Sequence, residues 1–242
     1  TGDLGQSYYY KTAVTTLIGQ RLEPTVSLAL LTITLAVAVA VPLGVLAAWR
    51  FGSLLDRALM GFSVLGFSMP VFVLAYILIW LISLKLGVLP VQGYKRMAEG
   101  LGPWLYHLTL PALTLSVVYV ALIARVTRAS VLETLGEDYI RTARAKGLPE
   151  GLVLRRHALR HTLLPVISLL GATASSALAG GLVAEVIFAI PGVGRLLYEA
   201  IGERDIPTVQ ACLLVQVSLA IVANWLADVA SRQVNPLLRA RS

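Results

Sequence analysis

The stretch Glu137-Asp-Tyr-Ile-Arg-Thr-Ala-Arg-Ala-Lys-Gly147 carries the strongest signal in this sequence. It is basic and helix-forming, it ends in glycine, and Pro149 follows two residues later. Apolar runs that are long enough to cross a membrane lie on both sides of it. A polar segment this long and regular between two such runs predicts a docking element. We therefore expect a membrane protein that a soluble partner drives.

The rest of the chain is too apolar for a soluble protein. Of its 242 residues, 57% are hydrophobic and 14% are charged, whereas soluble domains carry about 25% charged residues. A helix needs roughly 20 apolar residues to cross about 30 Å of hydrocarbon. Five such runs in so short a chain would leave a soluble protein too little polar surface. The uncharged runs are Pro24–Trp49, Ala58–Leu84, Gly100–Ala124, Thr162–Ala184 and Ile206–Ala227.

These runs predict an all-α membrane protein with five transmembrane helices. The second span is long enough to tilt or to break at Met69-Pro70, and the segment Gly87–Leu105 is expected to lie along the membrane interface. The expected spans are Thr25–Trp49, which enters after Pro24, Ala58–Lys85, Leu108–Ala124 with Pro111 in its first turn, Thr162–Ala184, and Pro207–Ala227.

The basic residues predict the orientation of these spans. The net charge is +7, which by itself also suits nucleic-acid binding. Alternating spans, however, place thirteen Lys and Arg residues on one side and seven on the other. The richer side is cytoplasmic by the positive-inside rule. The basicity is therefore mainly a topology signal, and we expect no nucleic-acid partner.

This orientation divides the chain into regions. Residues 1–23 form an extracytoplasmic segment, residues 24–235 form the transmembrane domain with a cytoplasmic loop at 129–160, and residues 236–242 form a cytoplasmic tail. Because an external N-terminal segment needs something to carry it across the membrane, we expect a further helix upstream. The full protein would then have six spans.

No metal site or disulfide is predicted. Cys212 is the only cysteine, so no intrachain disulfide can form. His157 and His161 stand four residues apart, a spacing that suits a metal, but no nearby carboxylate or cysteine completes the three or four ligands that such a site needs.

The cytoplasmic loop has the pattern of two helices around one turn. Glu137 and Arg141 form an i,i+4 pair in the favourable acid-first order. Gly147 suits the residue that follows a helix, and Pro149 suits the first position of the next helix.

The first of these helices has a narrow face made of Tyr139, Ala143 and Gly147, with Ile140 beside it. A face with alanine and glycine at its centre suits insertion into a protein cleft, whereas a helix on a lipid surface needs bulkier apolar residues. A solvated basic helix that touches anionic lipid is the alternative.

The fourth span contains a run of small residues, Gly171–Gly181, in which Leu178 is the only large side chain. Small residues at four-residue spacing let helices approach closely in lipid. The run therefore predicts either tight packing within the subunit or a passage at a subunit interface. In the second interpretation the residues on the path are Thr173, Ser175, Ser176, Gly180 and Glu185.

Glu185 stands at the outer end of this span. It is expected either to pair with Arg195 in a structural role, which we favour because carboxylates at a membrane edge commonly find a basic partner, or to meet the amino group of a cationic substrate. The sequence Pro191-Gly-Val-Gly194 beyond it predicts a rigid turn followed by flexible residues.

Beyond these patterns, Asp138-Tyr-Ile-Arg-Thr-Ala-Arg-Ala-Lys-Gly-Leu148 resembles the coupling-helix signature, or EAA loop, of ABC importer permeases. More narrowly, the chain resembles the B-type subunit of the dipeptide/oligopeptide/nickel permease family, and matches run from Thr1 to Arg239. The further matching motifs are Gly2-Asp-Leu-Gly-Gln-Ser7, Gly52-Ser-Leu-Leu-Asp-Arg57, Leu110-Pro-Ala-Leu-Thr-Leu115, Arg125-Val-Thr-Arg-Ala-Ser130, His157-Ala-Leu-Arg160 with Leu164-Pro165, and Val186-Ile-Phe-Ala-Ile-Pro-Gly-Val-Gly-Arg-Leu196.

The sequence departs from the family pattern at a few positions. Arg141 and Thr142 stand where the general loop has Glu and Ala, and Pro165 lies farther from Gly147 than usual; both features fit the peptide branch. Ile190 stands where that branch usually has Trp, and the tail has Asn235-Pro236 in place of Asp-Pro. These departures affect fine details of the substrate and leave the fold unchanged.

The resemblance implies a non-catalytic permease subunit in the inner membrane of a bacterium, in contact with lipid. It would pair with a second, C-type permease, bind two ATPase subunits, and receive substrate from an extracytoplasmic binding protein. ATP and magnesium would be bound by the ATPase subunits, with no cofactor in this chain. The cargo would be a dipeptide, an oligopeptide, a nickel chelate, glutathione or another small solute. The residues expected at the ATPase are Asp138, Tyr139, Ile140, Arg141, Thr142, Ala143, Arg144, Ala145, Lys146, Gly147 and Leu148.

The residues themselves argue against two other classes. A secondary transporter would need charged or titratable groups near the membrane midplane, and the five spans have none there. An intramembrane hydrolase would need a catalytic constellation within the membrane, whereas His107 is expected at the membrane interface and His157 and His161 in or next to the cytoplasmic loop. The sequence also lacks the glycine-rich loop with Lys-Ser/Thr that cradles ATP phosphates.

Overall fold

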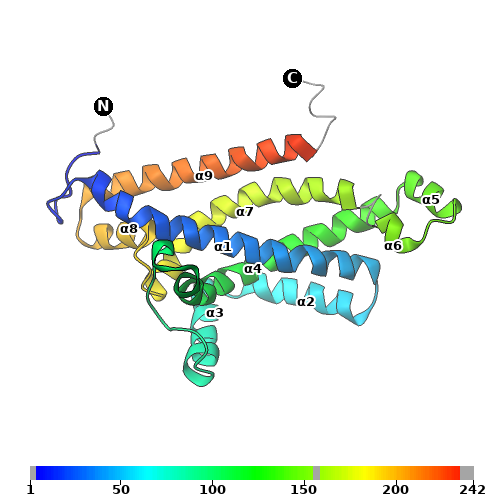
Figure 1. Cartoon of the computed structure of the whole chain (residues 1–242), viewed down its shortest axis with the longest axis horizontal. Coiled ribbons are helices and arrows are strands. Elements are labelled where there is room, and N and C mark those ends of the chain that lie inside the picture. Colours follow the sequence, from blue (N-terminus) through cyan, green and yellow to red (C-terminus); the bar gives the residue numbers. More distant parts are fainter. Residues whose placement is uncertain (1–3, 155–158, 235–242) are drawn as a thin grey trace. The chain divides into compact units, whose positions relative to one another are not determined.

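Long helices make up most of the chain. This computed structural model describes residues 4–154 and 159–234. Within them, the only pairing of extended backbone is an isolated bridge between Gln6 and Ala13. The helical elements in chain order are α1 (Val14–Trp49), α2 (Leu54–Ser68), α3 (Val71–Leu78), η1 (Ile79–Lys85), η2 (Met97–Glu99), α4 (Leu101–Leu135), α5 (Asp138–Ala145), α6 (Glu150–Leu152), α7 (Leu159–Ile187), α8 (Val193–Gly202) and α9 (Ile206–Val234) (Figure 1).

The described part of the chain has four helices that could cross a membrane, or five spans if a bent pair of helices is one of them. Four helices are long and apolar enough by themselves: α1, α4, the Pro165–Ile187 part of α7 and the Ile206–Gln233 part of α9. A fifth span arises if α2 and the segment Val71–Lys85 are taken as one broken helix. The predicted all-α membrane fold is confirmed.

The break in the second span falls at the predicted proline. Helix α2 ends at Ser68, and Pro70 caps the start of α3 with an extended backbone (φ −60°, ψ 138°). The residue before a proline is disfavoured in helical conformation, so Met69 interrupts the helix. At the far end, the Lys85 ammonium lies 4.2 Å from the centre of the Trp80 ring, which is a typical interfacial pair.

Pro24 and Pro111 lie inside helices, and the predictions that placed them at the starts of spans were wrong. Helix α1 begins at Val14, so residues 14–23 of the expected external segment are helical and Pro24 lies within α1. Helix α4 begins at Leu101, so Pro111 lies well beyond its first turn. Prolines are tolerated in membrane helices where neighbouring groups satisfy the freed carbonyl. Helix α4 also continues to Leu135, past its predicted inner end at Ala124.

The chain forms two compact units. The first unit comprises residues Thr1–Leu35, Met69–Ser116 and Ala174–Ala223, and the second comprises Ala36–Ser68, Val117–Thr173 and Asn224–Ser242. The first has a hydrophobic core around Val14, Leu196 and Cys212. In the described part of the second unit, one such core lies around Ala40 and Ile123 and another around Val131 and Ile140.

Small residues let the helices of the second unit approach closely. A Cβ atom on Gly44 of α1 would lie 2.6 Å from the carbonyl oxygen of Ala124 and 2.7 Å from Cβ of Thr127, both on α4. A Cβ on Gly171 of α7 would lie 2.9 Å from Cβ of Ala227 on α9. In lipid, where the hydrophobic effect does not drive helices together, van der Waals packing at such close contacts stabilises their association.

Gly44→Ala is expected to lower the thermal stability of the detergent-solubilised protein. The added methyl would force α1 and α4 apart, and overpacking of this kind costs about 1–3 kcal/mol. Gly19→Ala is the matched control, because it lies in the same helix and a Cβ there meets nothing within 4 Å. It should leave the melting temperature unchanged or raise it slightly. Equal melting temperatures for both variants would contradict the close contact.

Candidate functional site

The predicted cytoplasmic helix–turn–helix is present as α5 and α6. Gly147 has a left-handed backbone (φ +77°) and ends the first helix as expected. Pro149 was expected at the first position of the second helix but occupies the cap before it (φ −65°, ψ 141°). An extended proline there still orients the chain for the helix that starts at Glu150.

The ion pairs of this loop differ from the prediction. The guanidinium of Arg141 lies 3.4 Å from the Asp138 carboxylate, an i,i+3 pair, in place of the expected i,i+4 pair with Glu137. Glu137 caps the helix with an extended backbone, so it lies outside the helical spacing on which the expectation depended. Arg144 reaches across the turn to Glu150, with Nε and a terminal nitrogen 2.7 Å and 3.2 Å from the two carboxylate oxygens.

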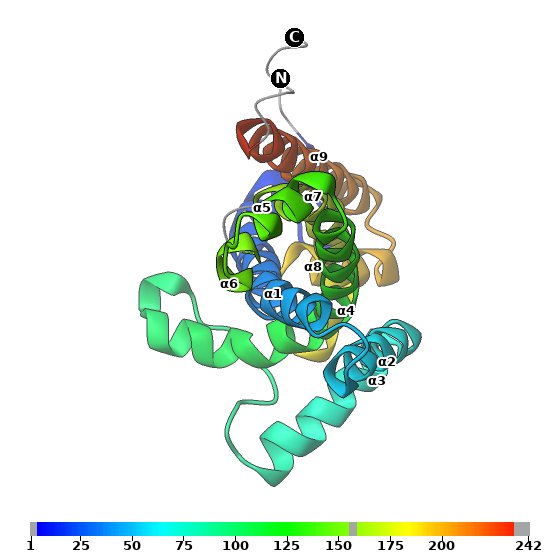
Figure 2. The same ribbon diagram turned by 90° about the vertical axis from the view of Figure 1, so that its right-hand side faces the viewer.

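The apolar residues of α5 are buried against the chain's own helices. Ile140 is fully buried and Ala143 is 5% exposed. They share a cluster with Ala48 at the end of α1, Val131 near the end of α4, and Val153. Figure 2 faces this end of the molecule and shows α5 and α6 in front of the ends of α1 and α4.

The expected docking face is therefore corrected. Ile140 and Ala143, which the sequence placed on a face for a partner, instead hold α5 onto the protein. An eight-residue helix is too short to be stable alone, so it buries its few apolar side chains against the nearest apolar surface. The outward side is polar and basic. Its exposed residues are Asp138, Tyr139, Arg141, Thr142, Arg144, Ala145, Lys146 and Gly147, and Leu148 is half-buried.

A buried ion pair fixes the start of α2 to α4 in the same unit. Asp56 is 3% exposed, and both of its carboxylate oxygens accept hydrogen bonds from the Arg128 guanidinium, from Nε and from a terminal nitrogen, the latter at 2.9 Å. The backbone N–H of Gly52 also donates to Asp56, at 3.0 Å. The guanidinium carbon of Arg128 lies 5.4 Å from the centre of the Phe51 ring.

Sequence reasoning missed this pair, although a signal for it existed. The motifs Gly52–Arg57 and Arg125–Ser130 each carry a charged residue at a span end, on the same predicted side of the membrane. Their proximity follows only from the packing of α2 on α4. The Ile140 cluster links α5 to the ends of α1 and α4. The Asp56–Arg128 ion pair then links α4 to α2.

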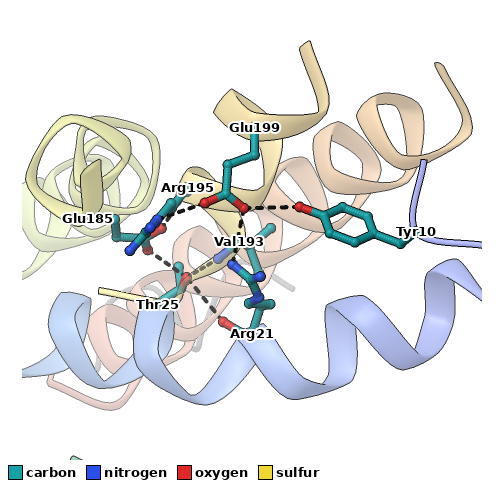
Figure 3. Close-up of polar contacts among 7 residues, drawn as sticks. All are labelled: Tyr10, Arg21, Thr25, Glu185, Val193, Arg195 and Glu199. Carbon is teal, nitrogen blue, oxygen red and sulfur yellow. Dashed lines mark hydrogen bonds and ion pairs between the residues drawn. The ribbon is translucent and has the colours of Figure 1, made fainter. Parts of the chain in front are cut away.

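On the side predicted to be external, Glu185 caps a helix. It is 1% exposed. Its carboxylate accepts hydrogen bonds from the hydroxyl of Thr25 at 2.6 Å and from the backbone N–H of Arg195 at 2.8 Å (Figure 3). Thr25 in turn accepts the backbone N–H of Val193 at 2.8 Å. Together the two side chains satisfy free N–H groups in the first turn of α8, where a negative charge also favours the helix dipole.

The favoured structural role of Glu185 agrees with this geometry, but its expected partner was wrong. Glu185 binds the backbone of Arg195, while the Arg195 guanidinium lies 2.8 Å from Glu199. Arg21 of α1 also lies 3.6 Å from Glu199. A carboxylate so enclosed is not on an exposed path, so its place among the path residues is corrected.

The two glycines of Pro191-Gly-Val-Gly194 allow the backbone to pass close to Glu185 and Leu182 of α7. A Cβ on Gly192 would overlap the Glu185 carboxylate, and one on Gly194 would lie 2.8 Å from Cα of Leu182. Gly192 has extended backbone angles (φ −98°, ψ −179°). The interpretation of these residues as flexible is therefore wrong: glycine is needed because the carboxylate occupies the space of a side chain.

The other predicted path residues do not form one site. Thr173 is 2% exposed, and its hydroxyl bonds carbonyls of its own helix at Leu169 and Leu170. Ser175 donates to the carbonyl of Ala220 on α9 at 3.1 Å. These contacts favour packing within the subunit for that side of α7. Ser176 and Gly180 are exposed.

A second carboxylate that sequence reasoning missed organises the N-terminal loop. Asp205 is fully buried between α8 and α9. It accepts hydrogen bonds from the hydroxyl of Ser7, from the backbone N–H of Tyr8 at 3.0 Å and from the hydroxyl of Thr208 at 2.7 Å. Burial raises the pKa of the Asp205 carboxyl, but these hydrogen bonds outweigh that effect, so the net pKa is lowered. The external motif at residues 2–7 thus supplies a partner for this carboxylate.

Some predicted features lie outside the described residues. These are His157, the motif at 157–160 in large part, residues 1–3 of the external motif, and the tail 236–242. Among residues that the structure does describe, no group of three or more His, Cys, Asp or Glu side chains could hold a metal ion.

Long apolar helices, with a short polar helix–turn–helix packed against the ends of α1 and α4, define a polytopic membrane protein. Residues 40–240 match the family described as binding-protein-dependent transport system inner membrane component. The chain belongs to this family. It is therefore an inner-membrane permease subunit of an ABC transporter, a class in which the membrane component is not the catalytic subunit.

Curated relatives cover almost the whole chain. A probable peptide ABC transporter permease protein of Sinorhizobium fredii is 45% identical over 98% of this chain and 76% of its own length. A putative peptide transport system permease protein of Brucella abortus is 40% identical over 98% and 76%. The dipeptide transport system permease protein DppB of Escherichia coli K12 is 38% identical over 98% and 77%.

Solved structures share the fold at low sequence identity. A chain of the MetNI methionine ABC transporter in an inward-facing conformation has a TM-score of 0.75 at 19% identity, covering 91% of this chain and 97% of that one. A chain of an amino acid ABC transporter gives 0.67 at 16% identity, covering 90% and 94%.

Asp56→Asn is expected to destabilise the protein by about 2 kcal/mol, because it leaves the Arg128 charge without its partner. The value is below that of a fully buried pair, since the Arg128 side chain is 16% exposed. Thermal unfolding in detergent would measure it, with Asp228→Asn, an exposed carboxylate near the end of α9, as control. The double variant Asp56→Asn/Arg128→Gln should recover part of the loss, and a strictly additive result would contradict the pairing.

Proposed function

We propose that this subunit carries short peptides across the inner membrane and is driven through the outward side of α5, which docks on an ATPase subunit. The observation that carries the proposal is the division of α5 into two sides. Ile140 and Ala143 attach the helix to α1 and α4, while the basic residues and Tyr139, which is 41% exposed, lie on the outward side.

The geometry of the second unit suits force transmission. Movement of α5 would act on Ala48 and Val131 through direct packing, because a packed cluster shifts as a body rather than deforming. The Asp56–Arg128 pair would carry the same movement to the start of α2. The Arg144–Glu150 pair holds α5 and α6 together across the turn, so that a push on either helix moves both.

The full assembly that we propose contains a second permease subunit, two ATPase subunits and an extracytoplasmic binding protein. ATP and magnesium belong to the ATPase subunits, and this chain contributes no catalytic group. The support for a peptide substrate is that the Sinorhizobium, Brucella and Escherichia relatives are all described as peptide or dipeptide permeases. A nickel chelate, glutathione or another small solute is the alternative. The exposed residues Ser176 and Gly180 are the part of the predicted path that remains open to a subunit interface or a substrate.

Tyr139→Ala is expected to reduce co-purification of the ATPase subunits and to abolish ATP-driven uptake, while the variant still inserts into the membrane. Loss of an exposed aromatic at a protein interface commonly costs about 2 kcal/mol or more. Tyr106→Ala, which removes a tyrosine of similar exposure (46%) from α4, is the matched control and should retain the ATPase subunits.

Two outcomes would contradict this docking role: undiminished ATPase retention in Tyr139→Ala, or an equal loss in both tyrosine variants. Ala143→Glu serves a different purpose. Because Ala143 is buried in the chain's own cluster, a glutamate there should disrupt the loop itself and lower thermal stability in the absence of any partner.

The substrate class is tested with the transporter reconstituted in lipid vesicles together with its own binding protein. We expect dipeptides or tripeptides to raise ATP hydrolysis several-fold over the unliganded binding protein, and the constituent free amino acids to have little effect. Stimulation by a nickel chelate but not by peptides would replace the peptide assignment and leave the docking role of α5 intact.

A further inference from the structure

A pocket of about 540 Å³ lies in the first unit, between the N-terminal loop and the last turns of α8. Tyr9 and Tyr10 line it from the loop, and Tyr198, Glu199, Ile201 and Glu203 line it from α8 and its end. None of these residues takes part in the ATPase docking proposed above. The charge distribution along the sequence assigns this region to the outside of the membrane.

The pocket stands on a fixed scaffold. The buried Asp205 holds the loop through Ser7 and the backbone of Tyr8. The hydroxyl of Tyr10 lies 3.2 Å from the Glu199 carboxylate, which Arg195 also contacts (Figure 3). The rings of Tyr9 and Tyr10 are therefore presented by a loop that is hydrogen-bonded at two points, to Asp205 between α8 and α9 and to Glu199 within α8.

The lining has the chemistry of a cation site. Glu199 is largely neutralised by Arg195 and Arg21. Glu203 is exposed and forms no ion pair with any residue in the described parts of the chain. Beside this free carboxylate, Tyr9 and Tyr198 are 53% and 59% exposed. Tyrosine faces attract ammonium and guanidinium groups, and rings of this kind also cover the alkyl stem of a long basic side chain.

We propose that this pocket receives a lysine or arginine side chain of the extracytoplasmic binding protein when that protein docks on the permease. The side chain would lay its stem against Tyr9 and Tyr198 and place its charge at Glu203. This inference rests on the proposed function for the presence of a binding protein, and it adds the contact that orients it.

A protein fits the pocket better than a lipid surface does. Interfacial tyrosines also occur at membrane edges, but a free carboxylate among them repels the phosphates of anionic lipids. Tyrosine and arginine are enriched at protein interfaces, where a rigid aromatic rim around one charged contact is a common arrangement. Arginine is favoured over lysine because its planar guanidinium stacks on rings while it bonds a carboxylate.

The test measures binding of the purified binding protein to the whole transporter in lipid nanodiscs. Glu203→Arg should weaken binding at least tenfold, Glu203→Gln should weaken it less, and the effect should shrink at high salt because exposed charges are screened. Glu99→Gln is the matched control, because Glu99 is an exposed glutamate on η2 outside the pocket. It should bind the partner as the unaltered transporter does. The variants' melting temperatures verify that they are folded.

A photo-crosslinking residue placed at Tyr198 identifies the occupant directly. Crosslinks to the binding protein support the proposal, whereas crosslinks to lipid alone, or unchanged affinity in Glu203→Arg, overturn it. Failure of the proposed function has a different signature: the unaltered transporter would then show no stimulation of ATP hydrolysis by its binding protein.

Discussion

The bilayer core offers the backbone no water, and this constraint determines the rest of the structure. Every N–H and C=O within the hydrocarbon must be satisfied inside its own segment, so the spans are helices. The four longest, α1, α4, α7 and α9, have 36, 35, 29 and 29 residues. Because lipid tails are as apolar as leucine, the hydrophobic effect contributes little to the association of these helices. They associate through close contact, and Gly44 and Gly171 provide it.

Three buried carboxylates lie at or beside helix starts, and each accepts hydrogen bonds there. Glu185 accepts N–H groups at the start of α8, Asp205 receives Ser7 and Thr208 at the start of α9, and Asp56 in the first turn of α2 accepts the N–H of Gly52. A helix start has free N–H groups and a positive dipole end. Placing an anion there fixes both the helix and the loop that leads to it.

Some of these features can be predicted from the sequence and others cannot. The difference is how far apart in the chain the residues that determine each feature lie. The apolar runs and the Gly147 stop depend on consecutive residues, so the spans and the helix–turn–helix could be predicted. Pro24 and Pro111 were expected to start helices, but the helices continue through them because tertiary neighbours decide whether a proline is tolerated. Asp56 and Arg128 are 72 residues apart, and no local pattern pairs them.

The stretch Glu137–Gly147 was the most informative part of the sequence, and its resemblance to a family motif made no distinction between its residues. The structure divides them. Ile140 and Ala143 are needed for the helix to remain on α1 and α4 at all, since eight residues do not form a stable helix in water. The outward residues, among them Asp138, Tyr139 and Arg141, are exposed and are not held in the cluster around Ile140. Similarity within this motif therefore includes residues that only attach the helix to its own chain, and it does not by itself identify which residues a partner would touch.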